Sequence, residues 1–418
     1  MTAAVASTVG SRRNLVALAW HGSFLAGATA LAQPTTLLPA YVAALGGSPA
    51  LVGLTLTVLL GGGAVPELLF SHRVEGSPLK RPFLLVAVFS RAAAWLVLGA
   101  ATWQLRRSAS GLLLGALLLL LAVFAIGGSL GNVAYTDVYG KSVPPGSRGR
   151  FYAARQFAGS VVALAATFCA GLVLQSHLAT LAGSYAVLFT GSGLLLLVAG
   201  LGFVAVRETP SPRQSRPPLG TYLRRMGTLW RADPGLRALV LVENLASLHL
   251  MLLPFYVVLA VEWLHVPPAM VAVYTMAQIV GGAVSNLLWG HLNDRVGSGA
   301  VLSACLALGS LMPVLALALA VFAPGAYALI FVVLGAAMNS RTLAYNNVLV
   351  DRSPVELRAT YTALVGTLTA PTLLLPLAGG ALIALFGFPA LFLGIAAALA
   401  ITWATLGRST ALFAPPLG

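Results

Sequence analysis

The chain has 418 residues, of which 59% are hydrophobic and only 8% are charged. Soluble domains carry about 25% charged residues, so this composition cannot supply a surface that faces water. Soluble enzymes, disordered tails and disulfide-stabilised secreted domains are therefore excluded. The net charge of +14 is placed between apolar segments and does not indicate a nucleic-acid partner. The sequence predicts an all-α membrane protein.

Apolar runs of about 20 residues, the length that crosses a bilayer, follow one another along the whole chain. They predict twelve transmembrane helices. The only basic residues before the first run are Arg12 and Arg13, and the run itself is too long for a signal-peptide core. We therefore expect no cleavable signal. The approximate bounds of the runs are 14–44, 49–70, 82–104, 111–139, 151–176, 184–206, 237–262, 268–290, 300–322, 326–350, 359–384 and 389–407.

Positive charge is distributed unevenly between the loops on the two sides of these runs. Nearly all Arg and Lys residues fall in the termini, the central segment and alternate loops, whereas only Arg106 and Arg107 lie in loops of the other side. Because basic loops stay in the cytoplasm, we expect a multi-pass protein of the cytoplasmic membrane with both termini cytoplasmic.

The longest polar stretch, residues 207–236, lies halfway along the chain and is expected to be a central cytoplasmic linker. Its proline-rich start excludes a regular helix there. The later part, residues 219–230, fits two interpretations: a plain tether, which we favour, or a basic amphipathic helix on an anionic membrane surface.

The two halves of the sequence repeat each other. Gly62-Gly63-Ala64-Val65 recurs as Gly281-Gly282-Ala283-Val284 at an offset of 219 residues. Tyr135 and Tyr345 match at an offset of 210 residues, together with several neighbours. With six runs in each half, the copies enter the membrane in the same direction. We therefore expect two parallel six-helix bundles, residues 1–206 and 237–418.

A short loop between the eighth and ninth runs carries a characteristic motif. It reads Gly290-His291-Leu292-Asn293-Asp294-Arg295-Val296-Gly297, with a degraded copy at residues 71–76 in the first half. Together with the six-plus-six arrangement and the long central loop, this motif resembles the loop motif of the major facilitator superfamily of secondary transporters.

The resemblance implies a cytoplasmic gate made by Gly290, Asp294, Arg295 and Gly297. In the family such an acidic residue accepts hydrogen bonds from neighbouring helix ends. These contacts close the gate in one state and break in the other. We expect the two glycines to permit close helix approach. The alternative is an ordinary basic loop with a turn.

Polar side chains within the apolar runs indicate an internal cavity, because polar groups at membrane depth face the bundle interior or water. Asn339, Thr342 and Asn346 share one helical stripe, and their counterparts in the first half are also polar. Hydrogen bonding between helices is the alternative reading. The expected cavity residues are Gln33, Asn132, Tyr135, Gln278, Asn339, Arg341, Tyr345 and Asn346.

Charged residues within the runs are few. Arg341 lies near the middle of the tenth run and requires a counter-charge or an anionic ligand there. Glu243 lies within the seventh run, and Asp137 lies near the end of the fourth. If transport is coupled to protons, Glu243 is the first candidate for the coupling carboxylate and Asp137 the second. A buried structural ion pair remains the alternative for each.

These observations predict a secondary transporter that moves a small solute by alternating access, with proton coupling left open. The span that carries a Gly-Pro signature in drug antiporters of the family has no proline here, which argues against a standard drug antiporter. Efflux of amphipathic compounds without that signature is an alternative. A transport-inactive scaffold or sensor is another. We expect no enzyme activity, cofactor, metal site or nucleic-acid partner, since no phosphate-binding loop or metal-ligand motif occurs. The expected partners are the solute and the bilayer, and the protein is expected to be a monomer.

Overall fold

The computed structural model describes residues 2–63, 66, 67, 70, 74, 77–105, 110–176, 180–210, 219–353 and 357–407. Within these residues the chain is α-helical throughout and contains no β-strand. In the part of the chain that the structure describes, nine segments are long and apolar enough to cross a membrane, so the predicted number of twelve is not confirmed. Helices are the expected outcome in a bilayer, because every backbone polar group must find its hydrogen-bond partner within the segment. The predicted all-α membrane class is confirmed.

The chain divides into two compact units. Unit 1 comprises Met1–Gly47, Thr55–Gln214 and Val266–Met276, and unit 2 comprises Ser48–Leu54, Ser215–His265 and Ala277–Gly418. Each unit thus contains one short segment from the other half of the sequence.

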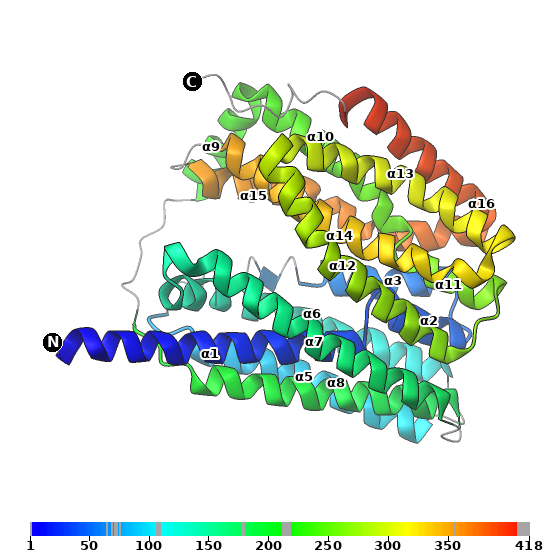
Figure 1. Ribbon diagram of the computed structural model, residues 1–418, viewed down its shortest axis with the longest axis horizontal. Helices are drawn as coiled ribbons and strands as arrows, with labels where there is room; N and C mark the ends of the chain where they lie inside the picture. The colour runs from blue at the N-terminus through cyan, green and yellow to red at the C-terminus, as the bar shows by residue number, and fades with distance from the viewer. Residues whose placement is uncertain are drawn as a thin grey trace. The chain divides into compact units, whose positions relative to one another are not determined.

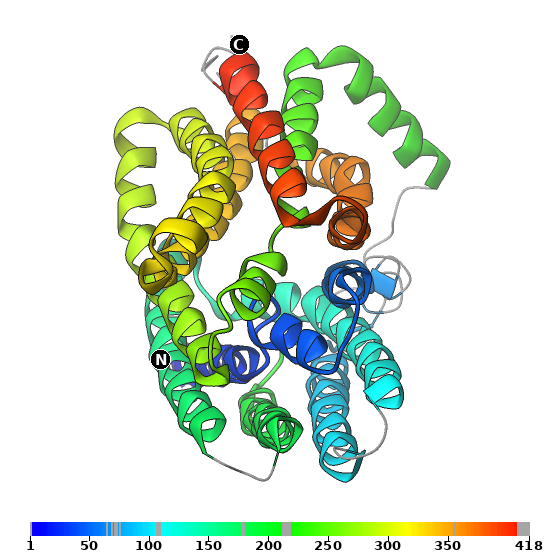
Figure 2. The same cartoon turned by 90° about the vertical axis from the view of Figure 1, so that its right-hand side faces the viewer.

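Unit 1 is built on long helices that run alongside one another (Figure 1), and Figure 2 views them close to end-on. Helix α5 packs against α6 and α8, and α1 packs against α7 and α8. Tyr41, Tyr185 and Phe189 form a buried aromatic core with Trp95. The helices of this unit are α1 (Thr2–Leu31), α2 (Leu37–Ala44), α5 (Arg81–Leu105), α6 (Ser110–Ser142), α7 (Arg148–Gln175) and α8 (Leu181–Ala205), with a 3₁₀ turn, η1, at Pro145–Ser147.

Two helices are shared between the units along their length. In helix α3 (Pro49–Gly61) the first residues belong to unit 2, and in helix α12 (Pro268–Val296) the first residues belong to unit 1. Close contacts explain both. A Cβ atom on Gly53 would lie 2.1 Å from the carbonyl oxygen of Pro376 in unit 2. In unit 1, the hydroxyls of Thr36 and Thr275 are hydrogen-bonded at 2.6 Å.

Unit 2 is centred on helices α13 (Ser298–Phe322), α14 (Ala328–Arg352) and α16 (Leu375–Thr402), with α13 packed against the other two. Its remaining elements are α9 (Leu219–Ala232), α10 (Pro234–Ala246), η2 (Ser247–Met251), α11 (Phe255–Trp263), η3 (Pro324–Ala326), α15 (Arg358–Thr369), η5 (Ala370–Leu374) and a terminal π-helical turn, η6 (Trp403–Gly407). Helix α16 is bent at Gly387, whose φ is 78°, and Pro389 follows. Only glycine adopts such a φ without strain.

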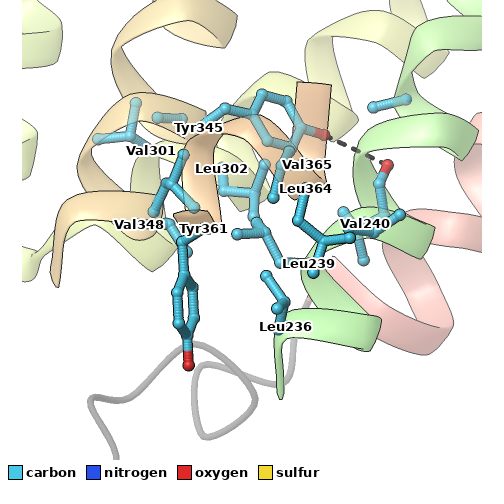
Figure 3. Close-up of a cluster of buried hydrophobic side chains, with 14 of the residues drawn as sticks. Leu236, Leu239, Val240, Val301, Leu302, Tyr345, Val348, Tyr361, Leu364 and Val365 are labelled. Carbon is cyan, nitrogen blue, oxygen red and sulfur yellow. Dashed lines mark hydrogen bonds between the residues drawn. The ribbon is translucent and has the colours of Figure 1, made fainter. Parts of the chain in front are cut away.

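A hydrophobic cluster joins α10, α13, α14 and α15 in unit 2 (Figure 3). Leu236, Leu302 and Val348 are fully buried in it. Met226 of α9 is also buried there, and Leu229 and Trp230 pack against it. Part of the central segment therefore forms a helix whose apolar side is anchored to unit 2. This is a third outcome for a segment in which the sequence suggested a plain tether or a membrane-surface helix.

Candidate functional site

The seventh predicted run is interrupted near its middle. Helix α10 ends at Ala246, the 3₁₀ turn η2 follows, and α11 begins only at Phe255. Pro254 has no amide hydrogen, so it cannot donate to the carbonyl four residues earlier, and the regular helix cannot continue through it. Broken helices in membrane proteins expose backbone groups where the surrounding protein or a ligand can use them.

Arg341 of α14 meets this break. Its Nη2 donates to the hydroxyl of Ser247 at 2.6 Å, and Ser247 in turn donates to the backbone oxygen of Glu243 at 2.6 Å. The guanidinium carbon lies 5.9 Å from the centre of the Tyr345 ring. Tyr345 is buried and donates to the backbone oxygen of Val242 at 3.3 Å, a bond drawn in Figure 3.

No direct ion pair with another described residue neutralises the charge of Arg341. Glu243 is half-buried and interacts electrostatically with Arg341. Among the described residues, however, no carboxylate lies within salt-bridge distance of this guanidinium. The structure thus brings three predicted site residues together, Glu243, Arg341 and Tyr345, and leaves Arg341 with N–H groups that bond no described side chain.

Two further residues of this region were missed by the sequence analysis. His249 lies in η2 and also interacts electrostatically with Arg341, and its ring centre lies 5.8 Å from that of Tyr256. Both ring nitrogens of His249 and the hydroxyl of Tyr256 are buried without a hydrogen-bond partner in the described part of the chain. The proline-induced break was a usable signal for His249, because Pro254 follows it closely.

Two of the predicted cavity residues, Gln278 of α12 and Asn339 of α14, form contacts between these two helices. Asn339 donates to the backbone oxygen of Gly282 at 2.6 Å and to Oδ1 of Asn286 at 3.2 Å. The side-chain nitrogen of Gln278 lies 3.2 Å from the sulfur of Met338. Asn346 is exposed on α14, and the side chain of Thr342 lies outside the described part. For Asn339 the alternative reading, a hydrogen bond between helices, accounts for its contacts.

In unit 1 the predicted site residues form separate contacts. Gln33 lies at the break between α1 and α2, where its backbone oxygen accepts hydrogen bonds from Thr36 and Leu38. Asn132 donates to Oε1 of Glu67 at 3.0 Å, and Tyr135 accepts a hydrogen bond of 2.5 Å from Arg155.

Asp137, the second coupling candidate, is engaged in an ion pair. Its Oδ2 lies 2.5 Å from Nζ of Lys141, one helical turn further along α6. Both side chains are partly exposed. The contact agrees with the structural-pair reading of this carboxylate, although it does not test a coupling role.

The predicted gate residues occupy the end of α12 and the turn into α13. Asp294 and Arg295 are exposed, and neither forms an ion pair with another described residue. The expectation of close helix approach at the two glycines is wrong. A Cβ on Gly290 or Gly297 would meet no atom within 4 Å, and Gly297 is instead required by its φ of 96°. Glycine here serves the turn conformation rather than helix packing.

A polar network that the sequence analysis did not identify lies at the start of α10. Asp233 caps this helix by accepting from the backbone N–H of Leu236 at 3.0 Å. It also pairs with Arg352 at 2.9 Å and accepts from the Tyr361 hydroxyl at 3.0 Å. Burial alone would raise the pKa of Asp233, but the hydrogen bonds from Arg352, Leu236 and Tyr361 outweigh it and hold the pKa below its usual value.

Glu208 performs a similar structural task in unit 1. Its carboxylate accepts hydrogen bonds of 2.7 Å from the backbone N–H groups of Lys80 and Arg81, at the start of α5. Anionic groups are stabilising at a helix N-terminus, where backbone N–H groups have no partner within the helix. Burial lowers the pKa of Lys80, whose ammonium donates to backbone oxygens of Val74 and Ser77.

No group of three or more His, Cys, Asp or Glu residues that could hold a metal ion occurs within the described ranges. A cavity of about 570 Å³ lies against α1 and α8, lined mainly by apolar residues together with Arg12 and Arg13. None of the predicted site residues lines it. The polar cluster around Arg341, and not this groove, is therefore the candidate site.

Comparisons with known proteins agree with this architecture. The sequence profile of the Major Facilitator Superfamily matches residues 251–412. A comparison with curated protein sequences found no significant match. Among solved structures, a POT family transporter in complex with a thioalcohol-conjugated peptide superposes with a TM-score of 0.73 at 11% identity, and the alignment covers 96% of each chain.

Two other structures extend the comparison. A POT family transporter in complex with 5-aminolevulinic acid gives a TM-score of 0.71 at 12% identity, again over 96% of each chain. The nucleoside transporter NupG gives a TM-score of 0.65 at 13% identity, and the alignment covers 96% of this chain and 98% of NupG. At such identities the likeness concerns the fold. The helices and the fold define a multi-pass membrane protein. The profile match adds a sequence similarity to the Major Facilitator Superfamily over residues 251–412.

Proposed function

We propose that this protein is a secondary transporter that moves a small solute across the cytoplasmic membrane by alternating access. The observation that carries the proposal is the partly buried guanidinium of Arg341, held by Ser247 at the break of a membrane helix with no direct counter-ion among the described residues. A permanent charge at such a place is costly and is typical of a transport pathway. The transporters of similar fold, named for peptides and nucleosides, support the same reading.

In this proposal the chain forms two parallel six-helix bundles, residues 1–206 and 237–418, joined by the linker 207–236, with both termini cytoplasmic. The solute site includes Arg341, Tyr345, Gln278, Asn339 and Asn346. The first half contributes Gln33, Asn132 and Tyr135. Glu243 is the leading candidate for proton coupling, and Asp137 is second because Lys141 already neutralises it. The loop of Gly290, Asp294, Arg295 and Gly297 acts as the gate.

The test is solute flux into proteoliposomes across a compound library, with and without a proton gradient. We expect saturable flux of at least one compound, and we expect Arg341→Ala to abolish it while the protein remains folded. Arg231→Ala is the matched control, because it removes an exposed arginine from α9. Absence of flux for every compound from a folded protein would overturn the proposal and favour a scaffold or sensor. Flux of amphipathic compounds only, and only outward, would favour the efflux alternative.

A further inference from the structure

The most unusual feature of the Arg341 region is a set of buried polar atoms that have no hydrogen-bond partner among the described residues. A buried donor or acceptor without a partner loses its hydration without compensation, so native proteins contain few of them. Here three such atoms gather around one turn: Nδ1 and Nε2 of His249 and the hydroxyl of Tyr256. Their shared location calls for one explanation.

The backbone and the rings around these atoms are held by hydrogen bonds and packing. The backbone amide of Leu252 donates to the oxygen of His249, which closes the turn at 3.0 Å. The hydroxyl of Tyr327 donates to the backbone oxygen of Tyr256 at 2.9 Å. The ring of Tyr256 is fully buried and also packs edge-on against Phe392. The hydrogen-bonded backbone and the packed Tyr256 ring thus hold these unpaired polar atoms in place.

The unused groups are mainly hydrogen-bond donors. Arg341 can only donate, and among the described residues its one hydrogen bond goes to Ser247, so most of its N–H groups remain for a ligand. Neutral histidine offers one N–H, and the tyrosine hydroxyl offers one O–H. A ligand that satisfies donors from three side chains must carry acceptors, and a planar carboxylate matches the fork of a guanidinium.

We propose that Arg341, His249 and Tyr256 form a binding site for a carboxylate group of the transported solute. This inference rests on the proposed transport function and adds the chemical class of the substrate. Glu243 lies within electrostatic range of Arg341. Glu243 is then available to the positively charged end of a solute that carries an amino group next to its carboxylate.

Binding is measured on the purified full-length protein in detergent, by isothermal titration and by thermal shift. The probes are straight-chain monocarboxylates, dicarboxylates and amino acids of two to six carbons, each paired with its uncharged amide. We expect at least one carboxylate to bind saturably and its amide to bind at least tenfold more weakly. Arg341→Lys should weaken binding by tenfold or more, because an ammonium cannot form the bidentate contact.

Tyr256→Phe separates a ligand-binding role from a structural one. Because the Tyr256 hydroxyl bonds nothing in the described chain, its removal should leave the melting temperature unchanged or raise it. Carboxylate binding should nevertheless weaken about fivefold to tenfold. His249→Gln keeps a polar side chain of similar reach and should retain part of the affinity. A fall in melting temperature with unchanged binding would overturn the proposal and indicate that these atoms bond water instead.

The outcomes also separate this proposal from transport itself. Equal binding of carboxylates and amides, or no binding by any probe, would overturn the carboxylate site. Saturable flux of an uncharged solute in the library experiment would then leave the transport function intact. Loss of both flux and binding in a folded protein would overturn both proposals.

Discussion

Asp233 and Arg352 form an ion pair of 2.9 Å between the start of α10 and the end of α14. Asn14 and Ser142 lie 219 and 210 residues before Asp233 and Arg352, the offsets at which other parts of the two halves of the sequence match. These two residues also meet: Nδ2 of Asn14 donates to the Ser142 hydroxyl at 3.2 Å, between α1 and α6. A neutral hydrogen bond thus joins α1 to α6 in unit 1, and a charged pair joins α10 to α14 in unit 2.

The charged pair should contribute more to stability than its neutral counterpart. Asp233 and Arg352 side chains are only 15% and 10% exposed, so removal of one partner leaves a poorly hydrated charge. We expect Asp233→Ala to lower stability by about 3 kcal/mol and Asn14→Ala by about 1 kcal/mol. The loss of stability in Asp233→Asn should lie between these two values, because asparagine still caps the helix. The measurement is thermal unfolding in detergent; equal losses at the two positions would contradict the expectation.

The same carboxylate predicts a pH dependence. The pKa of Asp233 is lower in the folded protein than in an unfolded chain, so the unfolded state binds more protons in the range between the two pKa values. The stabilisation is complete above the unfolded pKa of about 4 and is lost as the pH falls further. Melting temperatures measured from pH 7 to pH 3 should decline below about pH 4, and Asp233→Asn should decline less. If the melting temperatures of the unchanged protein and of Asp233→Asn fell equally with pH, Asp233 would not be the cause of the pH dependence.

The packing of α12 predicts that alanine substitution has opposite effects on stability at two glycines, Gly335 and Gly290. A Cβ on Gly335 would lie 2.0 Å from the backbone oxygen of Gln278, so the helices would have to separate. We expect Gly335→Ala to lower stability by about 2 kcal/mol or more and to weaken flux, since the Asn339 contact with Gly282 spans the same interface. Gly290→Ala meets no atom within 4 Å and should be neutral or stabilising by up to about 1 kcal/mol. Thermal unfolding of both variants decides the point.

The coupling role of Glu243 can be separated from solute binding. If Glu243 carries the coupling proton, Glu243→Gln should abolish uptake driven by a proton gradient but preserve solute exchange at equal pH. Asp137→Asn should retain most of the gradient-driven uptake, because Lys141 already pairs with that carboxylate. The measurement is uptake and counterflow in proteoliposomes. Unchanged gradient-driven uptake in Glu243→Gln would exclude it as the coupling group.

Composition and periodicity were sufficient for the class of protein. A chain with 8% charged residues and successive apolar runs can satisfy its backbone only as membrane helices. Arg341 was recognised from sequence for the same reason, since a guanidinium within an apolar run is costly wherever its side chain points.

Tertiary structure decided which polar groups meet. Asn339 and Arg341 are two residues apart on α14, yet one bonds α12 and the other bonds the turn η2. Their directions depend on how close each neighbouring helix lies, which no sequence spacing states. The sequence by itself thus determined that polar groups lie within the membrane helices. Only the packing of those helices showed that the Asp233 carboxylate is paired, while the His249 ring nitrogens and the Tyr256 hydroxyl have no partner in the described part of the chain. Such pairing depends on distances between segments far apart in the sequence.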